Sequence, residues 1–435
     1  MHSFAYLFER FPSFVQTFVY REAMEMGRQA MHPKLVSLRR PEDPESVAEK
    51  LAADVFYLPE PEEMRTDADR LQQEGKLPRA IHHAIREARK KHDSNRIFEA
   101  VWLGPRLRGE GITHVHAHFG GMAARTAWWL RKLHGITYSF TGHANDIFCE
   151  NEFPVSNADL VREAKFVVTE TDYARQWMEQ KHPRALGKVF RVYNGIDRDF
   201  PPRKPLPALP LILSVGRYVE KKGFTDLIES CRLLRNRGER FECRIVGGGP
   251  LQETLDAQIN EAGLQEVVRL LGPRSQNEVR QLLSEAHLFV LACVPESAGG
   301  SDNLPTVIME AMMCGVPVVS TRVAGVPEMI RHDRSGLLVE PRNPAALAEA
   351  IARLLRNPEL GETFSMRGHE TATASFPIEN TTRLLKHLLV REAGVKPPAE
   401  AFVLDPDLPR GWLHRWFGKS PSTKPDARPA TRSEG

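Results

Sequence analysis

The stretch "HLFVLACVPESAGGSDNLPTVIMEAMMCGVPVVST", residues 287–321, contains two short apolar runs separated by a loop and a helix-forming segment. The runs at 287–293 and 317–322 are rich in β-branched and aromatic residues, which favour strands. Pro305 suits the first turn of a helix, and Asp302 or Asn303 can cap that helix. A strand, a helix and a second strand in this order predict a parallel sheet covered by helices.

The same alternation extends in both directions along the chain. Strand-like runs begin at residues 54, 112, 136, 165 and 188 in the first half, and at 211, 242, 267 and 335 in the second. Amphipathic segments of helical length separate these runs. The chain is therefore expected to be α/β, with two doubly wound domains.

The predicted domain boundaries follow from the points where this alternation of strands and helices stops. Five prolines in "PPRKPLPALP", residues 201–210, forbid a continuous helix or central strand, so we expect a linker there between domains at 1–200 and 211–375. Residues 376–393 carry an apolar helical stripe and predict a crossover helix. Residues 394–435 are rich in Pro, Ser, Lys and Arg, which predicts disorder.

The composition excludes several classes of protein. The chain has 435 residues, of which 41% are hydrophobic and 26% charged, as in ordinary globular proteins. A net charge of +3 is too mild to demand nucleic acid. Five scattered cysteines without a CxxC pair argue against a disulfide framework or a zinc site and favour a reducing cytoplasm. Glu9 and Arg10 interrupt the N-terminal apolar run, so we expect neither secretion nor a membrane span.

Glu310 is an acid within an otherwise apolar helical segment. It lies eight residues past Asp302, roughly 12 Å along a helix that rises about 1.5 Å per residue. Carboxylates accept hydrogen bonds from vicinal hydroxyls, and a helix N-terminus attracts an anion. The two acids are therefore spaced to reach the ribose and the sugar of a nucleotide sugar, with the diphosphate between them. An isolated acid in such a segment can instead simply pair with a buried arginine.

Residues 302–321, "DNLPTVIMEAMMCGVPVVST", resemble the acid-x7-Glu signature of retaining glycosyltransferases of family 4, in the subgroup that makes exopolysaccharide, O-antigen or colanic acid. Most members carry Glu at the first acidic position. Asp302 is its shorter homologue here, with Glu296 as the alternative. The resemblance covers the chain up to about residue 393. It implies the GT-B fold, with two facing Rossmann-like domains and a C-terminal helix that returns to the first domain.

The resemblance also implies roles for individual residues. Arg217 and Lys222, in "SVGRYVEKKGFTDLI", would neutralise the leaving diphosphate. Glu310 would bind the ribose, Asp302 the sugar hydroxyls, and His143, in "SFTGHANDI", the sugar from the other domain. Further donor contacts are expected at Gly216, Gly248, Arg274, Asn303, Leu304, Pro305 and Thr306, and acceptor-side contacts at Gln16, Thr17 and His118.

The expected activity is transfer of a sugar from a UDP-sugar or GDP-sugar to a glycan or lipid-linked acceptor in surface polysaccharide biosynthesis, without a metal or other cofactor. His114, His116 and His118 alternate along a strand, but no carboxylate or cysteine partner is evident for a metal site. A GT-B sugar epimerase and a noncatalytic nucleotide-sugar-binding protein are the alternatives. A dinucleotide dehydrogenase is disfavoured because no GxGxxG follows a strand.

Two basic segments bear on where the protein acts. The run at residues 87–96 is most simply a solvated helix face, but it can also contact anionic lipid. Residues 410–420 place aromatic side chains among Arg and Lys, a composition suited either to a bilayer interface or to the protein's own surface. We therefore expect a cytoplasmic protein that can make peripheral contact with the inner membrane surface.

Overall fold

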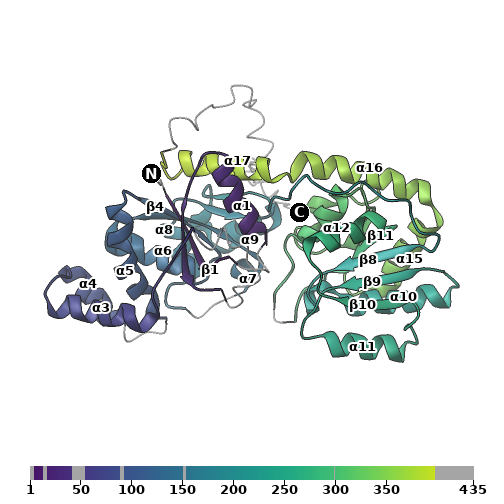
Figure 1. Cartoon of the computed structure of the whole chain (residues 1–435), viewed down its shortest axis with the longest axis horizontal. Coiled ribbons are helices and arrows are strands. Elements are labelled where there is room, and N and C mark those ends of the chain that lie inside the picture. The colour runs from purple at the N-terminus through teal and green to yellow at the C-terminus, as the bar shows by residue number, and fades with distance from the viewer. Residues whose placement is uncertain are drawn as a thin grey trace, which may run out of the picture. The chain divides into compact units, whose positions relative to one another are not determined.

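The computed structural model describes residues 4–12, 17–41, 54–88, 93–149, 153–297 and 299–396. Two parallel sheets organise these residues, each in its own lobe (Figure 1). Apolar strand residues are buried in both lobes, as expected where helices cover both faces of a parallel sheet. The predicted α/β class with two doubly wound domains is confirmed.

The first sheet has the strand order β3-β2-β1-β4-β5-β6-β7 in the described residues, so the order reverses between β1 and β4. Its strands are β1 (Ala5–Arg10), β2 (Lys34–Arg39), β3 (Val55–Tyr57), β4 (His114–His118), β5 (Thr137–Gly142), β6 (Val167–Thr169) and β7 (Val189–Arg191). Its helices are α1 (Thr17–Arg28), α3 (Pro61–Gln73), α4 (Arg79–Ala88), α5 (Asn95–Gly109), α6 (Met122–His134), α7 (Ala144–Phe148), α8 (Asn157–Glu163) and α9 (Asp172–Lys181), with a 3-10 turn at Pro183–Ala185.

The second sheet has the order β10-β9-β8-β11-β12-β13 and reverses between β8 and β11. Its strands are β8 (Leu211–Val215), β9 (Glu242–Val246), β10 (Val268–Gly272), β11 (Leu288–Leu291), β12 (Val318–Thr321) and β13 (Leu337–Val339). Its helices are α10 (Phe224–Asn236), α11 (Gln252–Glu261), α12 (Gln276–Glu285), α13 (Thr306–Met313), α14 (Val326–Met329), α15 (Pro344–Arg356) and α16 (Pro358–Ser375), with a 3-10 turn η3 at Glu220–Lys222.

Helix α17 (Ile378–Arg391) packs on the first lobe. Figure 1 shows it running beside α1. The Gln29 side chain donates to the carbonyl of Glu379, and Lys386 donates to the carbonyl of Gln29, both at 2.9 Å. The predicted return of a C-terminal helix to the first domain is therefore part of the fold. The domain boundaries at 200, 210 and 375 stay a prediction.

The start of α13 corrects one expectation. The helix begins at Thr306, Pro305 occupies the N-cap position, and no side chain caps the first amides. The prediction that Asp302 or Asn303 caps the helix was wrong, because these side chains bind elsewhere: Asp302 pairs with Lys222, and Asn303 accepts a hydrogen bond from Thr171. The amides at the start of α13 therefore remain available to a ligand.

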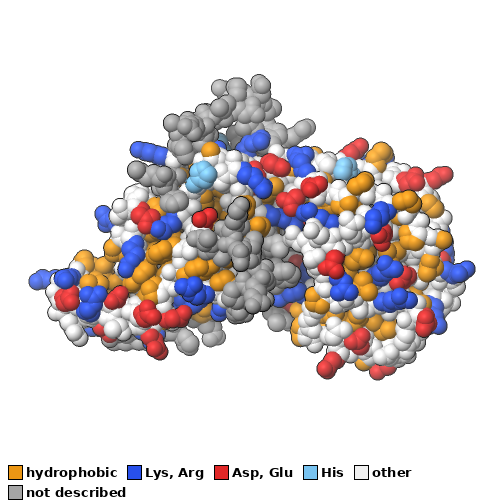
Figure 2. All heavy atoms as spheres, viewed as in Figure 1, with side chains coloured by type: hydrophobic (Ala, Val, Ile, Leu, Met, Phe, Trp, Pro, Cys, Tyr) orange, Lys and Arg blue, Asp and Glu red, His pale blue; other side chains and the backbone are white. Residues whose placement is uncertain are grey.

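The remaining observations concern membrane spanning, surface charge and the predicted segments that lie outside the described residues. Within the described ranges, every helix is too short or too polar to span a bilayer. Acidic and basic side chains are interspersed over the face shown in Figure 2. Gln16 and the aromatic and basic segment at 410–420 lie outside the described residues, as does the tail from 397 onward.

Candidate active site

A cavity of about 590 Å³ lies where loops from both sheets meet. Its walls are the loops that follow β4, β5, β6, β7 and β8, together with the starts of α1 and α13. Open parallel sheets bind ligands at these strand ends. The predicted site residues that line it are Thr17, His143, Gly216, Arg217, Lys222, Asp302, Asn303, Leu304, Pro305 and Thr306. Lining residues that the sequence analysis missed are Phe18, Phe119, Ala144, Asp146, Glu170, Asn194 and Lys221.

Lys222 is fixed in this cavity by its backbone and by one acid. It ends the turn η3, and the next residue, Gly223, has φ 64°. A Cβ on Gly223 would lie 1.7 Å from the carbonyl oxygen of Ala292, so only glycine fits. The Lys222 ammonium pairs with Asp302. Burial lowers the pKa of Lys222, but Asp302 and Cys293 together raise it by more, so the net pKa is raised and Lys222 stays a cation.

Arg217 supplies a second cation to the same cavity. Its side chain is exposed, and among the described residues it makes no ion pair or hydrogen bond. The positive charge of Arg217 acts to lower the pKa of Lys222, which shows that the two cations lie near one another. An unpaired guanidinium, a lysine and an uncapped helix start together form a site for an anion with several oxygens, such as a diphosphate.

Glu310 does not line the cavity. Its Oε1 accepts a hydrogen bond from Nη2 of Arg21 in α1 at 3.0 Å, with side-chain exposures of 13% and 5%. Arg21 also lies 3.5 Å from Asp197. The structure therefore shows the simpler alternative for an acid in an apolar helix, a buried arginine partner. The assignment of Glu310 to a donor ribose stays a prediction.

His143 is oriented by a carboxylate on the neighbouring strand. Gly142 is in register with Thr169 in the parallel pair β5–β6, so the residues that follow, His143 and Glu170, lie side by side. Nδ1 of His143 is 2.6 Å from Glu170 Oε1, and its buried Nε2 has no partner. Burial lowers the pKa of His143, but the carboxylates around it, Glu170 foremost, together raise it by more, so the net pKa is raised. Glu170 thus fixes the imidazole at the cavity wall, with Nε2 as its one unpartnered nitrogen.

Glu170 also joins the two lobes. It accepts hydrogen bonds from Asn194 at 2.5 Å and from Asn303 at 3.2 Å, and Asn303 accepts from the Thr171 hydroxyl at 2.7 Å. The Asn303 amide is thus engaged by protein groups rather than free for a donor. Gly325 permits this contact, since a Cβ there would lie 2.2 Å from Thr171 Cγ2.

Phe119 has a strained backbone at the cavity wall. Its φ is 71°, and a left-handed conformation costs an L-residue roughly 1–2 kcal/mol. Its amide donates to the carbonyl of Thr141 at 2.9 Å, which holds the strained residue in place. The Phe119 ring centroid lies 4.4 Å from that of His143, and the Phe18 ring lies 4.9 Å from it on another side.

The alternating histidines are core residues. Each ring nitrogen of His114 and His116 lies 2.7–3.0 Å from a hydroxyl of β5. Burial lowers the pKa of His114 to about 3 and that of His116 well below its ordinary value, so both are neutral. His118 is buried, and its Nε2 lies 3.2 Å from Glu22 rather than in the cavity. In the described parts of the chain, no group of three or more His, Cys, Asp or Glu side chains is placed to hold a metal.

The remaining predicted donor residues lie apart from the cavity. Gly248 packs against Pro273, where an added Cβ would be 3.2 Å from Cγ. The Arg274 side chain donates to the carbonyl of Pro273 at 2.9 Å. Their predicted contacts with a nucleotide stay predictions. Of the missed residues, Glu170 gave the clearest signal in the sequence, because it is an acid near the end of the strand-like run that begins at residue 165.

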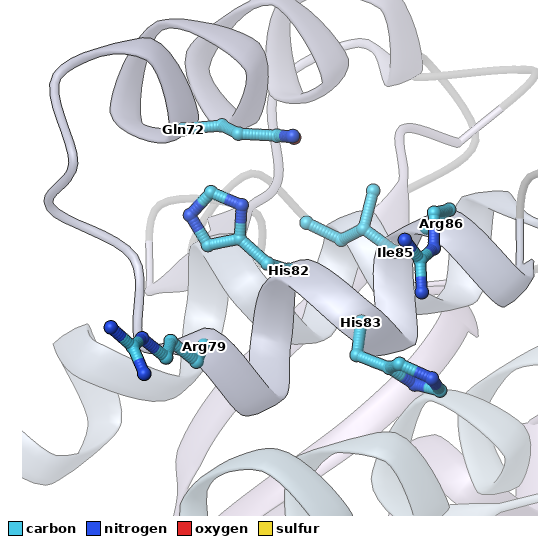
Figure 3. Close-up of a pocket in the computed structure, with 6 residues that line it drawn as sticks. All are labelled: Gln72, Arg79, His82, His83, Ile85 and Arg86. Atoms are coloured by element: carbon cyan, nitrogen blue, oxygen red, sulfur yellow. The ribbon is translucent and has the colours of Figure 1, made fainter.

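A second, basic cavity of about 470 Å³ lies between α3 and α4. Figure 3 shows His82 pointing from α4 toward Gln72 of α3. Arg79 and Arg86 are exposed on α4 and give the cavity wall positive charge, and the imidazoles of His82 and His83 also line it. This cavity adjoins the basic run at 87–96 that the sequence analysis identified.

Parts of this chain are similar to known proteins. Residues 197–371 match the family "Glycosyl transferases group 1". WcaL of Escherichia coli (strain K12), a protein named for colanic acid biosynthesis, is 35% identical over 243 residues, which are 54% of this chain and 60% of that protein. The chain spans about a third to three fifths of the length of this and two other curated relatives.

Solved structures show the fold. A glycosyltransferase from Rickettsia africae superposes with a TM-score of 0.68 at 16% identity and covers 90% of this chain and 100% of that one. Anabaena HepE, crystallised with UDP and glucose, gives a TM-score of 0.65 at 18% identity and covers 89% and 100% of the two chains. The two-sheet architecture is therefore the GT-B fold, and the lobe that carries Arg217, Lys222 and Asp302 matches the group 1 glycosyl transferases.

Proposed function

We propose that the protein is a retaining, family 4-like glycosyltransferase. In this proposal it transfers a sugar from a UDP-sugar or GDP-sugar to a glycan or lipid-linked acceptor in surface polysaccharide biosynthesis, without a metal cofactor. The observation that carries the proposal is the unpaired Arg217 beside the fixed Lys222 at the start of α13. The group 1 match and the UDP bound by HepE support it.

Arg217 and Lys222 act on the leaving diphosphate, where negative charge develops during the reaction. The acceptor hydroxyl attacks the anomeric carbon on the side from which the diphosphate departs, and a diphosphate oxygen takes the hydroxyl proton. Arg217 and Lys222 stabilise the negative charge on the leaving group, an effect that grows as the glycosidic bond breaks. Asp302 keeps Lys222 in place through their ion pair and offers its carboxylate to sugar hydroxyls.

His143 acts from the opposite wall of the cavity. Its Nδ1 is bound to Glu170, which leaves Nε2 as the group that meets the donor. In the protonated form, Nε2 donates a hydrogen bond to a sugar or phosphate oxygen. Because Glu170 raises the pKa of His143, this form persists to higher pH than it would in an isolated imidazole.

The test is release of nucleoside diphosphate from a panel of UDP-sugars and GDP-sugars, with and without EDTA. Arg217→Ala should slow release by roughly 100-fold. Arg269→Ala is the matched control, since Arg269 is an exposed arginine of the same lobe outside the cavity. Release from no nucleotide sugar, or equal effects of the two variants, would refute the proposal. A product with inverted anomeric configuration would refute retention, and an epimerised donor would identify an epimerase instead.

We also propose peripheral contact with the inner face of the cytoplasmic membrane through the α3–α4 cavity. The exposed Arg79 and Arg86 would attract anionic headgroups. The test is cosedimentation with phosphatidylglycerol-containing vesicles, compared with phosphatidylcholine alone. Arg79→Glu/Arg86→Glu should abolish the difference. The control, Arg334→Glu/Arg367→Glu, changes two exposed arginines of a second-lobe cavity and should retain it. Loss of binding in both double variants would contradict this site.

A further inference from the structure

Two aromatic rings in the cavity have no part in the donor chemistry. Phe18, at the start of α1, and Phe119, after β4, both line the cavity and are only half-buried. Their ring centroids are 6.4 Å apart, and both rings lie against His143. Phenylalanine is among the residue types most often fully buried. These two rings instead present apolar surface to a polar cavity.

The backbone of Phe119 gives independent evidence that its ring is needed there. Phe119 adopts φ 71°, a conformation that bulky residues avoid, although Gly120 and Gly121 follow it directly. Strain of this kind concentrates at functional sites, where the surrounding structure holds it. In this chain, the hydrogen bond from its amide to Thr141 does so. A glycine would adopt this conformation without strain, but only an aromatic residue places a ring beside His143.

The two walls of the cavity differ in chemistry. The second lobe contributes the cations Arg217, Lys221 and Lys222, which suit a diphosphate. The first lobe contributes the phenylalanines and two carboxylates, Asp146 and Glu170. An aromatic surface flanked by hydrogen-bond acceptors is unsuited to a diphosphate. It suits a molecule with an apolar face and hydroxyls at its rim.

We propose that Phe119 and Phe18 form an acceptor subsite that binds a pyranose ring through its C–H face. This inference rests on the proposed function and narrows it, because the acceptor is then a sugar residue rather than a bare lipid alcohol or an open-chain polyol. The ring hydroxyls would meet Asp146, whose carboxylate accepts hydrogen bonds. The stacked sugar would thereby present one hydroxyl to the donor sugar beside His143.

The test uses saturation-transfer NMR with methyl glucosides, galactosides and mannosides as probes and glycerol as the open-chain comparison. The wild-type protein should bind at least one methyl hexoside and should favour it over glycerol. Phe119→Gly removes the ring and occupies φ 71° without strain, so its melting temperature should stay within a few degrees of wild type. Its binding of the hexoside should weaken about tenfold. Phe119→Tyr keeps the ring and should retain binding.

Two further variants keep the outcome decisive. Phe153→Leu removes another partly exposed ring of the first lobe, one outside the cavity, and should bind the hexoside as wild type does. If Phe119→Gly loses stability together with binding, Phe18→Leu decides: weakened hexoside binding supports the subsite, and wild-type binding overturns it. No hexoside binding by the wild type, or undiminished binding by Phe119→Gly, also overturns it. Because NMR detects binding without turnover, these results are distinct from failure of the nucleotide-sugar assay.

Discussion

Gly325→Ala tests whether the contact between the lobes at Asn303 assembles the active site. The added Cβ would lie 2.2 Å from Thr171 Cγ2 and 2.5 Å from the Asn303 carbonyl oxygen, both well inside an ordinary van der Waals contact of 3.4 Å. The backbone of Gly325 has φ −83°, which alanine adopts freely, so the clash is the only new cost. Relieving it requires the loop of Asn303 and the loop of Thr171 to separate by about 1 Å.

The expected loss follows from what that separation breaks. The hydrogen bonds from Thr171 to Asn303 and from Asn303 to Glu170 would lengthen, at a cost of about 1 kcal/mol each. A misplacement of about 1 Å between catalytic groups can slow a reaction roughly 100-fold. We therefore expect Gly325→Ala to lower kcat about 100-fold in the nucleotide-sugar assay.

The control and the rescue make this prediction specific. Gly361→Ala, in α16, places its Cβ 3.9 Å from the nearest atom and should leave kcat unchanged. Thr171→Ser removes the Cγ2 atom that makes the closest contact, so it should restore part of the activity of Gly325→Ala. Wild-type kcat in Gly325→Ala, or equal losses in both glycine variants, would show that the contact is not needed for catalysis.

Three further predictions concern charged groups. Lys222→Ala should lower kcat far more than it raises the donor KM, because its charge matters most on the departing diphosphate; equal changes in both constants would contradict this. Glu170→Gln removes the group that raises the pKa of His143, so activity that needs the protonated imidazole should be lost at lower pH than in wild type, and an unmoved alkaline limb of the kcat/KM profile would argue against it. Wild type should also have a higher free energy of unfolding than Glu170→Gln. This difference should be greatest below pH 6.5 and should shrink as pH rises through the folded-state pKa of His143. Arg21→Met leaves the Glu310 carboxylate without its cation and should cost about 3 kcal/mol of stability, whereas Arg21→Met/Glu310→Gln should recover part of it in thermal unfolding; additive losses would show that the pair is not coupled.

The sequence revealed most strands because each buried run is short, apolar and bounded by turn residues. It did not reveal β1 or β2, although both lie within the first sheet, where β1 runs between β2 and β4. The first four residues of β1 are buried, but Glu9 and Arg10 at its end are only partly covered. Those charged residues made the run look interrupted. They mark instead the point where the strand leaves the core at the carboxyl edge of the sheet.

The family resemblance pointed to Arg217 and Lys222, and both line the cavity. Arg217 and Lys222 follow β8 within a few residues. Gly223, in a backbone conformation that only glycine fits here, fixes the turn between that strand and the next helix. Their positions therefore depend mainly on nearby sequence. The acid-x7-Glu spacing was less informative, because Asp302 and Glu310 are not on one continuous helix.

The sequence alone determined the order of strands and helices and the burial of each run. It also determined which strand ends carry Arg217, Lys222 and His143. Only the tertiary structure decided the partners of these groups. Arg21 and Glu310 are 289 residues apart, and Thr171 and Asn303 are 132 apart. The physical reason is that strand register and lobe packing choose which strand ends meet, and neither is encoded in the hydrophobic pattern of a single segment.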